Sequence, residues 1–205
     1  MTYLKLNQRT TSRFRLPLHS EKDACNALHK SMIAETRRKG RQLDMNEDYL
    51  KQVREVAQWL YNQQTSGLLI CGKVGNGKTA TMDAVIALYT LGDFFDNGIK
   101  IGFKRLDALA LTDIYNESRD EFQAAKRCPM LAIDDLGCEN VNVQKFGNET
   151  SPITELIAYR YQEQKLTIIT TNLTSDMIRE RYGERIADRL KEMMTMVIFR
   201  NKSYR

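Results

Sequence analysis

One glycine-rich segment limits what this chain can fold into more than any other feature. The segment Gly72–Thr79, GKVGNGKT, follows a short apolar run and precedes a stretch with helical periodicity. Glycines let successive backbone N–H groups turn toward one anion, and the start of the following helix offers further N–H donors. The segment also fits the complete phosphate-loop pattern G-x-x-x-x-G-K-[ST]. It therefore predicts a strand, a phosphate-binding loop and a helix, in that order.

This loop is the expected binding site for a nucleoside triphosphate. The lysine would reach the β- and γ-phosphates, and the threonine hydroxyl would bind Mg²⁺. A nucleoside triphosphate is therefore the expected ligand, with Mg²⁺ as its cofactor; ATP as the substrate is what the family resemblance given below implies. The candidate ATP-binding residues are Gly72, Lys73, Val74, Gly75, Asn76, Gly77, Lys78 and Thr79.

Short apolar runs alternate with helical patterns along most of the chain. This alternation favours a mainly parallel sheet with helices on both faces. We expect an α/β fold, the three-layer αβα domain of P-loop NTPases, with a five-stranded sheet. The predicted strands are Leu68–Cys71, Ile99–Phe103, Met130–Ile133, Leu166–Thr170 and Met196–Phe199. The predicted helices are Lys78–Leu91, Leu106–Ala125, Pro152–Gln164 and Ser175–Met193, the last divided in two.

The first 45 residues differ from the rest in charge. They carry ten Lys/Arg and four Asp/Glu, a net charge of +6, whereas the remaining residues carry twenty-one and twenty-two, a net charge of −1. We expect residues 1–45 to form a basic extension with one helix, Glu21–Gly40, which would bury Ala24, Leu28 and Met32. The basic excess favours a contact with nucleic acid or an acidic protein, but it is also typical of a solvated arm.

A second N-terminal helix is expected to open the main domain, residues 46–205. Asn46 is a good N-cap residue for it. The three- and four-residue spacing of its apolar residues predicts one buried face, with Trp59 at the edge. The members of that face are Leu50, Val53, Val56, Ala57, Leu60 and Tyr61.

The compartment follows from what the sequence lacks. The cysteines, Cys25, Cys71, Cys128 and Cys138, form no C-x-x-C pair and have no histidine at ligand spacing, so we expect neither a zinc site nor a disulfide framework. There is no run of eighteen apolar residues, and the polar N-terminus does not resemble a signal peptide. We therefore expect a cytoplasmic protein that makes no membrane contact.

Two carboxylates end one of the predicted strands, in the stretch MLAIDDLG that begins at Met130. A buried carboxylate is costly unless it meets a cation. Asp134 is therefore a candidate magnesium ligand together with Thr79, and Asp135 is a candidate to orient and polarise an attacking water. The alternative is a strand end with two solvated aspartates.

Two further segments carry candidate catalytic side chains. TIITTN ends in Asn172, whose amide would lie between the γ-phosphate and the water held by Asp135; the alternative is a turn-forming asparagine. RYGERIADRL carries Arg185 and Arg189 four residues apart, hence on one helical face. A guanidinium there would reach a γ-phosphate bound by a neighbouring subunit. The same pattern is also typical of a charged surface helix.

Together and in this order, the four elements resemble the AAA+ ATPases of the DnaC/DnaI helicase-loader and IstB transposition-helper group. The resemblance covers roughly residues 67–199 and is carried by GNGKT, AIDDLG, RYQEQKLTIITTNL and YGERIADRL. The roles that it implies are phosphate binding for Gly72–Thr79, magnesium binding and water activation for Asp134 and Asp135, nucleotide sensing for Asn172, and a finger role for Arg189, with Arg185 as the alternative.

The resemblance implies a DNA-replication ATPase that assembles as a homo-oligomer on single-stranded DNA and helps to load a replicative helicase. An IstB-like helper that delivers a transposase is the alternative within the group. An ATP-sensing module without turnover and a small-molecule kinase are alternatives from other classes. Lys104 and Arg105 are candidate DNA contacts.

The sequence departs from the usual AAA+ pattern near its C-terminus. It ends six residues after Phe199, so we expect little or no C-terminal helical lid. Arg200 and Arg205 are the candidates to replace the arginine that such a lid usually supplies.

Overall fold

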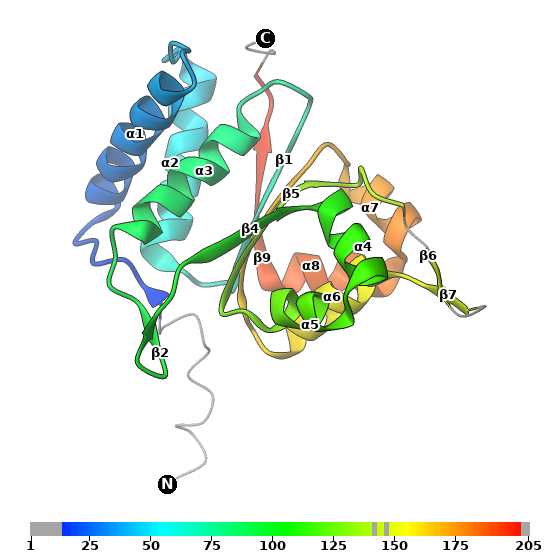
Figure 1. Ribbon diagram of the computed structural model, residues 1–205. Coiled ribbons are helices and arrows are strands. Elements are labelled where there is room, and N and C mark those ends of the chain that lie inside the picture. Colours follow the sequence, from blue (N-terminus) through cyan, green and yellow to red (C-terminus); the bar gives the residue numbers. More distant parts are fainter. Residues whose placement is uncertain (1–13, 141–142, 146–147, 202–205) are drawn as a thin grey trace, which may run out of the picture.

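The computed structural model describes residues 14–140, 143–145 and 148–201 (Figure 1). Its centre is a five-stranded sheet in which every neighbouring pair is parallel, as the alternation of strands and helices predicted. The strand order is β4-β5-β8-β1-β9. The bounds are β1 Gly67–Gly72, β4 Phe103–Asp107, β5 Met130–Leu136, β8 Leu166–Thr171 and β9 Met194–Phe199.

Helices cover both faces of this sheet, so the expected three-layer αβα architecture is confirmed (Figure 1). Successive residues of a strand point to opposite faces. In β1, Leu68 and Ile70 enter one core, and Leu69 and Cys71 enter the other. The first core lies under α1 Glu21–Arg38, α2 Glu47–Asn62 and α3 Lys78–Thr90. The second lies under α4 Ala108–Glu117, α5 Arg119–Arg127, α6 Pro152–Gln162, α7 Ser175–Tyr182 and α8 Glu184–Met193.

The N-terminal helix α1 packs against both α2 and α3. The Ser20 hydroxyl accepts a hydrogen bond from the Asp23 N–H at the start of α1, and Ala24, Leu28 and Met32 are buried as predicted. The helix therefore shares a hydrophobic core with the sheet.

The start of α2 is confirmed, but its predicted buried face is partly wrong. The Asn46 side chain accepts a hydrogen bond from the Tyr49 N–H, which makes it the N-cap. Leu50 and Tyr61 are 52% and 39% exposed, whereas Trp59 is only 2% exposed. The reason is that α2 contacts both α1 and β9, so its buried sector is rotated toward these neighbours.

The region between α3 and β5 differs from the prediction in two places. The strand predicted at Ile99–Phe103 is wrong: β3, Ile99–Lys100, pairs with β2, Phe95–Asp96, in a hairpin, and the sheet strand begins only at Phe103. Asn97 and Gly98 have φ angles of 49° and 78°, so this Asn-Gly pair forms the hairpin turn.

The single helix predicted at Leu106–Ala125 is likewise two helices, because Ser118 ends α4 and its hydroxyl caps α5.

The polar segment Gly137–Thr150, between β5 and α6, contains a second small hairpin. Its strands are β6 Val143–Lys145 and β7 Asn148–Thr150, which pair in antiparallel fashion. Only residues 200 and 201 are described after β9, and they form no helix. No described helix is long and apolar enough to cross a membrane.

Candidate nucleotide-binding site

A cavity of about 1140 Å³ lies at the carboxyl ends of the central strands. This edge of an open parallel sheet is where ligands usually bind. One wall is the loop between β1 and α3, and another is formed by the ends of β5 and β8. The predicted residues that line the cavity are Val74, Gly75, Asn76, Gly77, Lys78, Thr79, Asp134, Asp135 and Asn172.

Glycines shape the backbone of the predicted phosphate loop. Gly77, the N-cap of α3, has a φ angle of 94°, a left-handed conformation that favours glycine. At Gly72, with φ 153°, an added Cβ would lie 2.4 Å from the Asn76 amide nitrogen and 2.6 Å from the Phe199 carbonyl oxygen. The buried Asn76 amide donates to that carbonyl at 3.0 Å, so the loop is attached to the end of β9. The loop thus directs the N-terminus of α3 toward the cavity.

Lys78 joins the phosphate loop to the end of β8. Its ammonium group donates to the carbonyl oxygens of Gly72 and Lys73, each at 2.8 Å, and to the Asn172 side-chain oxygen at 2.8 Å. Lys78 is buried, whereas Asn172 is exposed at the cavity. The two side chains are 94 residues apart in sequence but are in direct contact in the structure.

Asp134 lies where the phosphate loop meets β5. Its Oδ1 accepts from the Thr79 hydroxyl at 3.1 Å and from the Thr170 hydroxyl at 2.5 Å. Its Oδ2 accepts from Arg105 at 2.6 Å. The carboxylate is buried and has a partner on each oxygen. The predicted pair Thr79 and Asp134 is thus brought together from residues 55 positions apart.

Asp135 interrupts the regular course of β5. Its φ angle is 53°, and the pairing of β5 with β8 shifts register between Ile133 and Leu136. Its backbone N–H donates to the Thr170 hydroxyl at 2.9 Å. A bulge of this kind redirects side chains at functional edges of sheets. Here both carboxylates of the Asp-Asp pair reach the same cavity.

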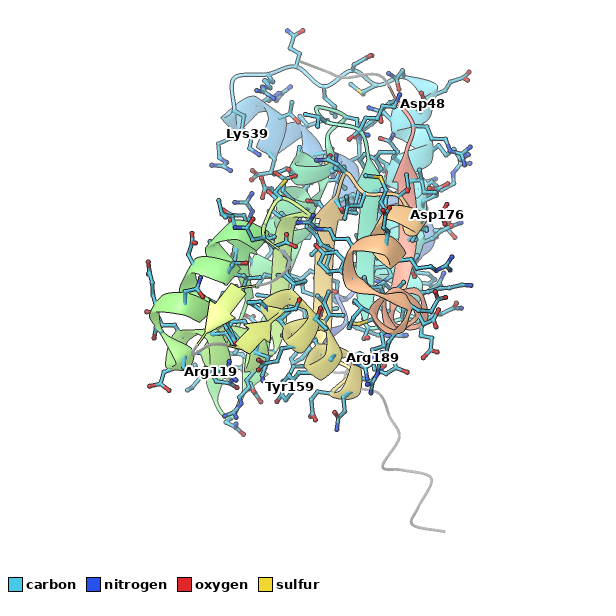
Figure 2. All side chains as sticks on the ribbon, turned by 90° about the vertical axis from the view of Figure 1, so that its right-hand side faces the viewer. Lys39, Asp48, Arg119, Tyr159, Asp176 and Arg189 are labelled. Carbon is cyan, nitrogen blue, oxygen red and sulfur yellow. The ribbon has the colours of Figure 1, made fainter. Side chains whose placement is uncertain are left out.

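Neither predicted finger arginine lines this cavity. Arg185 is exposed in the first turn of α8 and forms no ion pair with any described residue. The Arg189 guanidinium lies 5.5 Å from the centre of the Tyr161 ring. Figure 2 places Arg189 at the end of the molecule opposite to Lys39, which lines the cavity. Arg200 is exposed just after β9, and Arg205 lies outside the described residues.

Sequence reasoning missed one wall of the cavity. The end of α1 and the segment leading to α2 supply it, through residues that match no nucleotide-binding motif. The only feature of the sequence that could have indicated this wall is that two predicted helices precede the phosphate loop. The lining residues from this region are Met32, Thr36, Lys39, Arg41, Gln42, Leu43, Asp44, Tyr49 and Gln52.

Sequence reasoning also did not predict that three further polar residues lie close to the aspartates. The Thr170 hydroxyl contacts both aspartates of the pair, as described above. Glu139 is buried in the loop after β5, where it accepts from the Gly137 N–H at 2.9 Å and from the Tyr182 hydroxyl of α7. Arg105, a candidate DNA contact, also contacts Asp134.

The residues around Thr79 and Asp134 suit Mg²⁺. The ion prefers oxygen ligands and usually takes only one or two from protein carboxylates, the rest coming from phosphates and water. Here a hydroxyl and a carboxylate oxygen lie 3.1 Å apart beside the phosphate loop. Among the described residues, no group of three or more His, Cys, Asp or Glu could hold a metal by itself. A bound nucleotide would add phosphate oxygens as further ligands.

The electrostatic surroundings of two cysteines near the site are unusual. Burial raises the pKa of the Cys71 thiol to about 11, an effect that the nearby Lys78 partly offsets. Burial also raises the pKa of Cys138, and the negative charges of Asp135 and Glu139 raise it further. Both thiols are therefore poor nucleophiles at neutral pH.

No family model matches the chain, and no curated protein matches it significantly. Solved structures do. A DnaC helicase loader matches with a TM-score of 0.55 and 23% identity, over 78% of this chain and 94% of that one. DnaI matches with a TM-score of 0.59 and 16% identity, over 88% and 95%. This chain therefore shares its fold with these helicase loaders.

A third similar structure is a replication initiator, DnaA, bound to AMPPCP and single-stranded DNA. Its TM-score is 0.54 and its identity 16%, and the match covers 78% of this chain but only 49% of that one. The resemblance inferred from the motifs is thus confirmed for the fold.

Proposed function

We propose that this protein is a Mg²⁺-dependent ATPase of the helicase-loader kind. The observation that carries the proposal is the convergence of two pairs at one cavity, Lys78 with Asn172 and Thr79 with Asp134. A glycine turn that served only to join a strand to a helix would not need these four side chains to meet. Their meeting is the arrangement that phosphoryl transfer requires.

In this proposal the residues divide the work of hydrolysis. The N–H groups of Gly72–Thr79 bind the phosphates, and Lys78 leaves its carbonyl partners to bind the β- and γ-phosphates. Asn172, which accepts a hydrogen bond from Lys78, would then also lie beside the γ-phosphate. Asp135 orients the attacking water. Mg²⁺, when bound by Thr79 and Asp134, supplies charge stabilisation for the phosphates.

Arginines from a neighbouring subunit complete the site. We assign this finger role to Arg189, with Arg185 as the alternative, because both lie on α8 outside their own cavity. ATP hydrolysis then requires a homo-oligomer. The DnaA structure with single-stranded DNA supports DNA as the surface on which copies assemble. The loader structures support a replicative helicase as the partner, in the cytoplasm, and no observation favours the transposase alternative.

The test of the nucleotide site compares binding with turnover. The Lys78→Ala variant should lose ATP binding, because the loop loses the cation that faces the phosphates. The Asp135→Asn variant should keep ATP binding and lose hydrolysis by about a hundredfold or more, because the amide cannot polarise water as a carboxylate does. A fluorescent ATP analogue measures binding, and phosphate release with single-stranded DNA present measures turnover.

Lys51→Ala is the matched control, because this exposed lysine on α2 lies outside the cavity. It should behave like the wild type. Unchanged nucleotide affinity of Lys78→Ala would reject the site. A hydrolysis rate that Asp135→Asn leaves unchanged would instead favour an ATP-sensing module.

A further inference from the structure

Arg105 is an unusual neighbour for a magnesium-binding carboxylate. Its Nη2 lies 2.6 Å from Oδ2 of Asp134, and its Nε lies 3.1 Å from Oδ1 of Asp83 on α3. In the parallel pairing of β4 with β5, Arg105 is opposite Ala132 and Asp107 is opposite Asp134. Arg105 therefore lies two positions before Asp134 on the same face of the sheet, and its long side chain reaches forward to the carboxylate.

Asp134 has little capacity left for a further partner. A carboxylate offers about four lone-pair sites for hydrogen bonds. The hydroxyls of Thr79 and Thr170 take two on Oδ1, and Arg105 takes one on Oδ2. The Thr79 bond is compatible with Mg²⁺, because the hydroxyl can donate its proton to Asp134 while its oxygen binds the metal. The Arg105 bond is different, since a cation there occupies the side of Asp134 that a hydrated Mg²⁺ would need.

We propose that Arg105 competes with Mg²⁺ for Asp134 and so sets the magnesium concentration at which the site takes up Mg-nucleotide. The proposal rests on the proposed function and adds a residue outside its motifs. Two cations on one carboxylate repel each other, and Mg²⁺ keeps several waters that need room. Binding of the metal therefore has to move the outer end of the guanidinium.

The surroundings of Arg105 allow this movement. Its side chain is 46% exposed, so the guanidinium can turn into water without being dehydrated. Its Nε can stay on Asp83 and serve as the pivot. Asp83 is itself held by Lys39, at the end of α1, through an ion pair of 2.6 Å. The pivot is thus attached to α3 and α1, whereas the mobile Nη2 faces the metal site.

The experiment measures magnesium requirement rather than activity. A fluorescent derivative of AMPPCP, which is not hydrolysed, is titrated at a series of Mg²⁺ concentrations and constant ionic strength. The Mg²⁺ concentration that gives half of the magnesium-dependent gain in affinity should fall about threefold to tenfold in Arg105→Gln, the effect of losing one ion pair that is half exposed to solvent. Arg105→Lys, which keeps the charge but not the two-point contact, should lie between this variant and the wild type.

The control is Arg37→Gln, which removes the same charge from the end of α1. Arg37 is exposed and, among the described residues, forms no ion pair with Asp83 or Asp134. The magnesium requirement of Arg37→Gln should therefore match that of the wild type. If Arg105→Gln has the same magnesium requirement as the wild type, or a higher one, the proposal is overturned. If Arg105→Gln does not fold, as judged by thermal unfolding, the Arg105→Lys result decides.

A second readout separates this inference from the proposed function. Mn²⁺ alone, followed by electron paramagnetic resonance, should bind more tightly to Arg105→Gln than to the wild type. If the wild type binds no nucleotide but this difference appears, the ATPase proposal fails, and only the competition of Arg105 with a divalent cation for Asp134 stands. If the wild type binds Mg-nucleotide and neither readout responds to Arg105→Gln, only the role of Arg105 fails.

Discussion

Single side chains between strands hold the two aspartates of the site in place. Thr170, fully buried in β8, uses one hydroxyl for both of them. The hydroxyl oxygen accepts a hydrogen bond from the Asp135 N–H at 2.9 Å, and the hydroxyl donates one to Oδ1 of Asp134 at 2.5 Å. Thr170 is therefore a positioning residue, which acts on the predicted chemistry through the aspartates.

Replacing this hydroxyl should affect turnover more than binding. Thr170→Val keeps the shape of the side chain but removes both hydrogen bonds, so the aspartates lose their orientation. We expect kcat to fall roughly tenfold to a hundredfold, with a smaller change in nucleotide affinity. Thr170→Ser restores the hydroxyl and should recover most of the activity. Steady-state ATPase assays and nucleotide titrations measure the two effects; wild-type kcat in Thr170→Val would contradict the role.

At the scale of elements, one buried arginine joins three of them at the edge of the sheet opposite the cavity. Arg160 on α6 is 0% exposed. It donates to the carbonyl oxygens of Lys126, Cys128 and Leu166 and to the Thr167 hydroxyl, at 2.7 to 3.1 Å. These groups lie at the end of α5, just before β5 and at the start of β8. Arg160 therefore links the backbone at these three places through one guanidinium group.

Removing this arginine should destabilise the fold. Arg160→Met fills much of the same volume but leaves the three carbonyl groups without these donors, so we expect a loss of about 3 kcal/mol in the free energy of unfolding. Arg127→Met, at the exposed end of α5, is the matched control and should change stability by less than about 0.5 kcal/mol. Urea unfolding followed by circular dichroism compares them. Equal stability of the two variants would show that water satisfies the carbonyl groups.

At the scale of the whole molecule, the cavity and the arginine helix point in different directions. Arg189 lies on α8 at the end opposite to the Lys39 side of the cavity (Figure 2). One chain therefore presents a phosphate loop at one place and candidate finger arginines at another. This arrangement is what a site shared between two subunits requires.

Mixing two inactive variants tests this sharing. Lys78→Ala lacks nucleotide binding but keeps α8, and Arg189→Ala lacks the finger but keeps the loop. Each variant alone should lose most DNA-stimulated ATPase activity. Lys78→Ala binds no ATP, and Arg189→Ala loses a finger that is worth roughly 10³–10⁵ in rate when supplied in trans. The mixture should regain activity, since a Lys78→Ala subunit can supply Arg189 to its neighbour.

The same mixing with Arg185→Ala decides which arginine acts. Lys191→Ala, exposed on the same helix, should keep wild-type activity and serves as the control. A mixture no more active than the sum of its two components would argue against a shared site.

Local patterns were enough to predict much of this molecule. The glycine-rich loop between a strand and a helix, the strand that ends in two aspartates, the Asn46 cap and the alternation of strands and helices were all predicted correctly as structure. Each of these depends on residues a few positions apart, whose spacing alone sets the turn, cap or face. The parallel three-layer fold followed from that alternation.

Only the tertiary structure decided which distant residues share the site. Arg105 and Thr170 meet Asp134 across 29 and 36 positions, and the wall from α1 and α2 lies against a loop that follows both helices. The exposed side of α2 and the true start of β4 were set in the same way, by which neighbours each element packs against. Hydrophobic period and turn chemistry are local, whereas strand register and side-chain partners depend on the packed sheet.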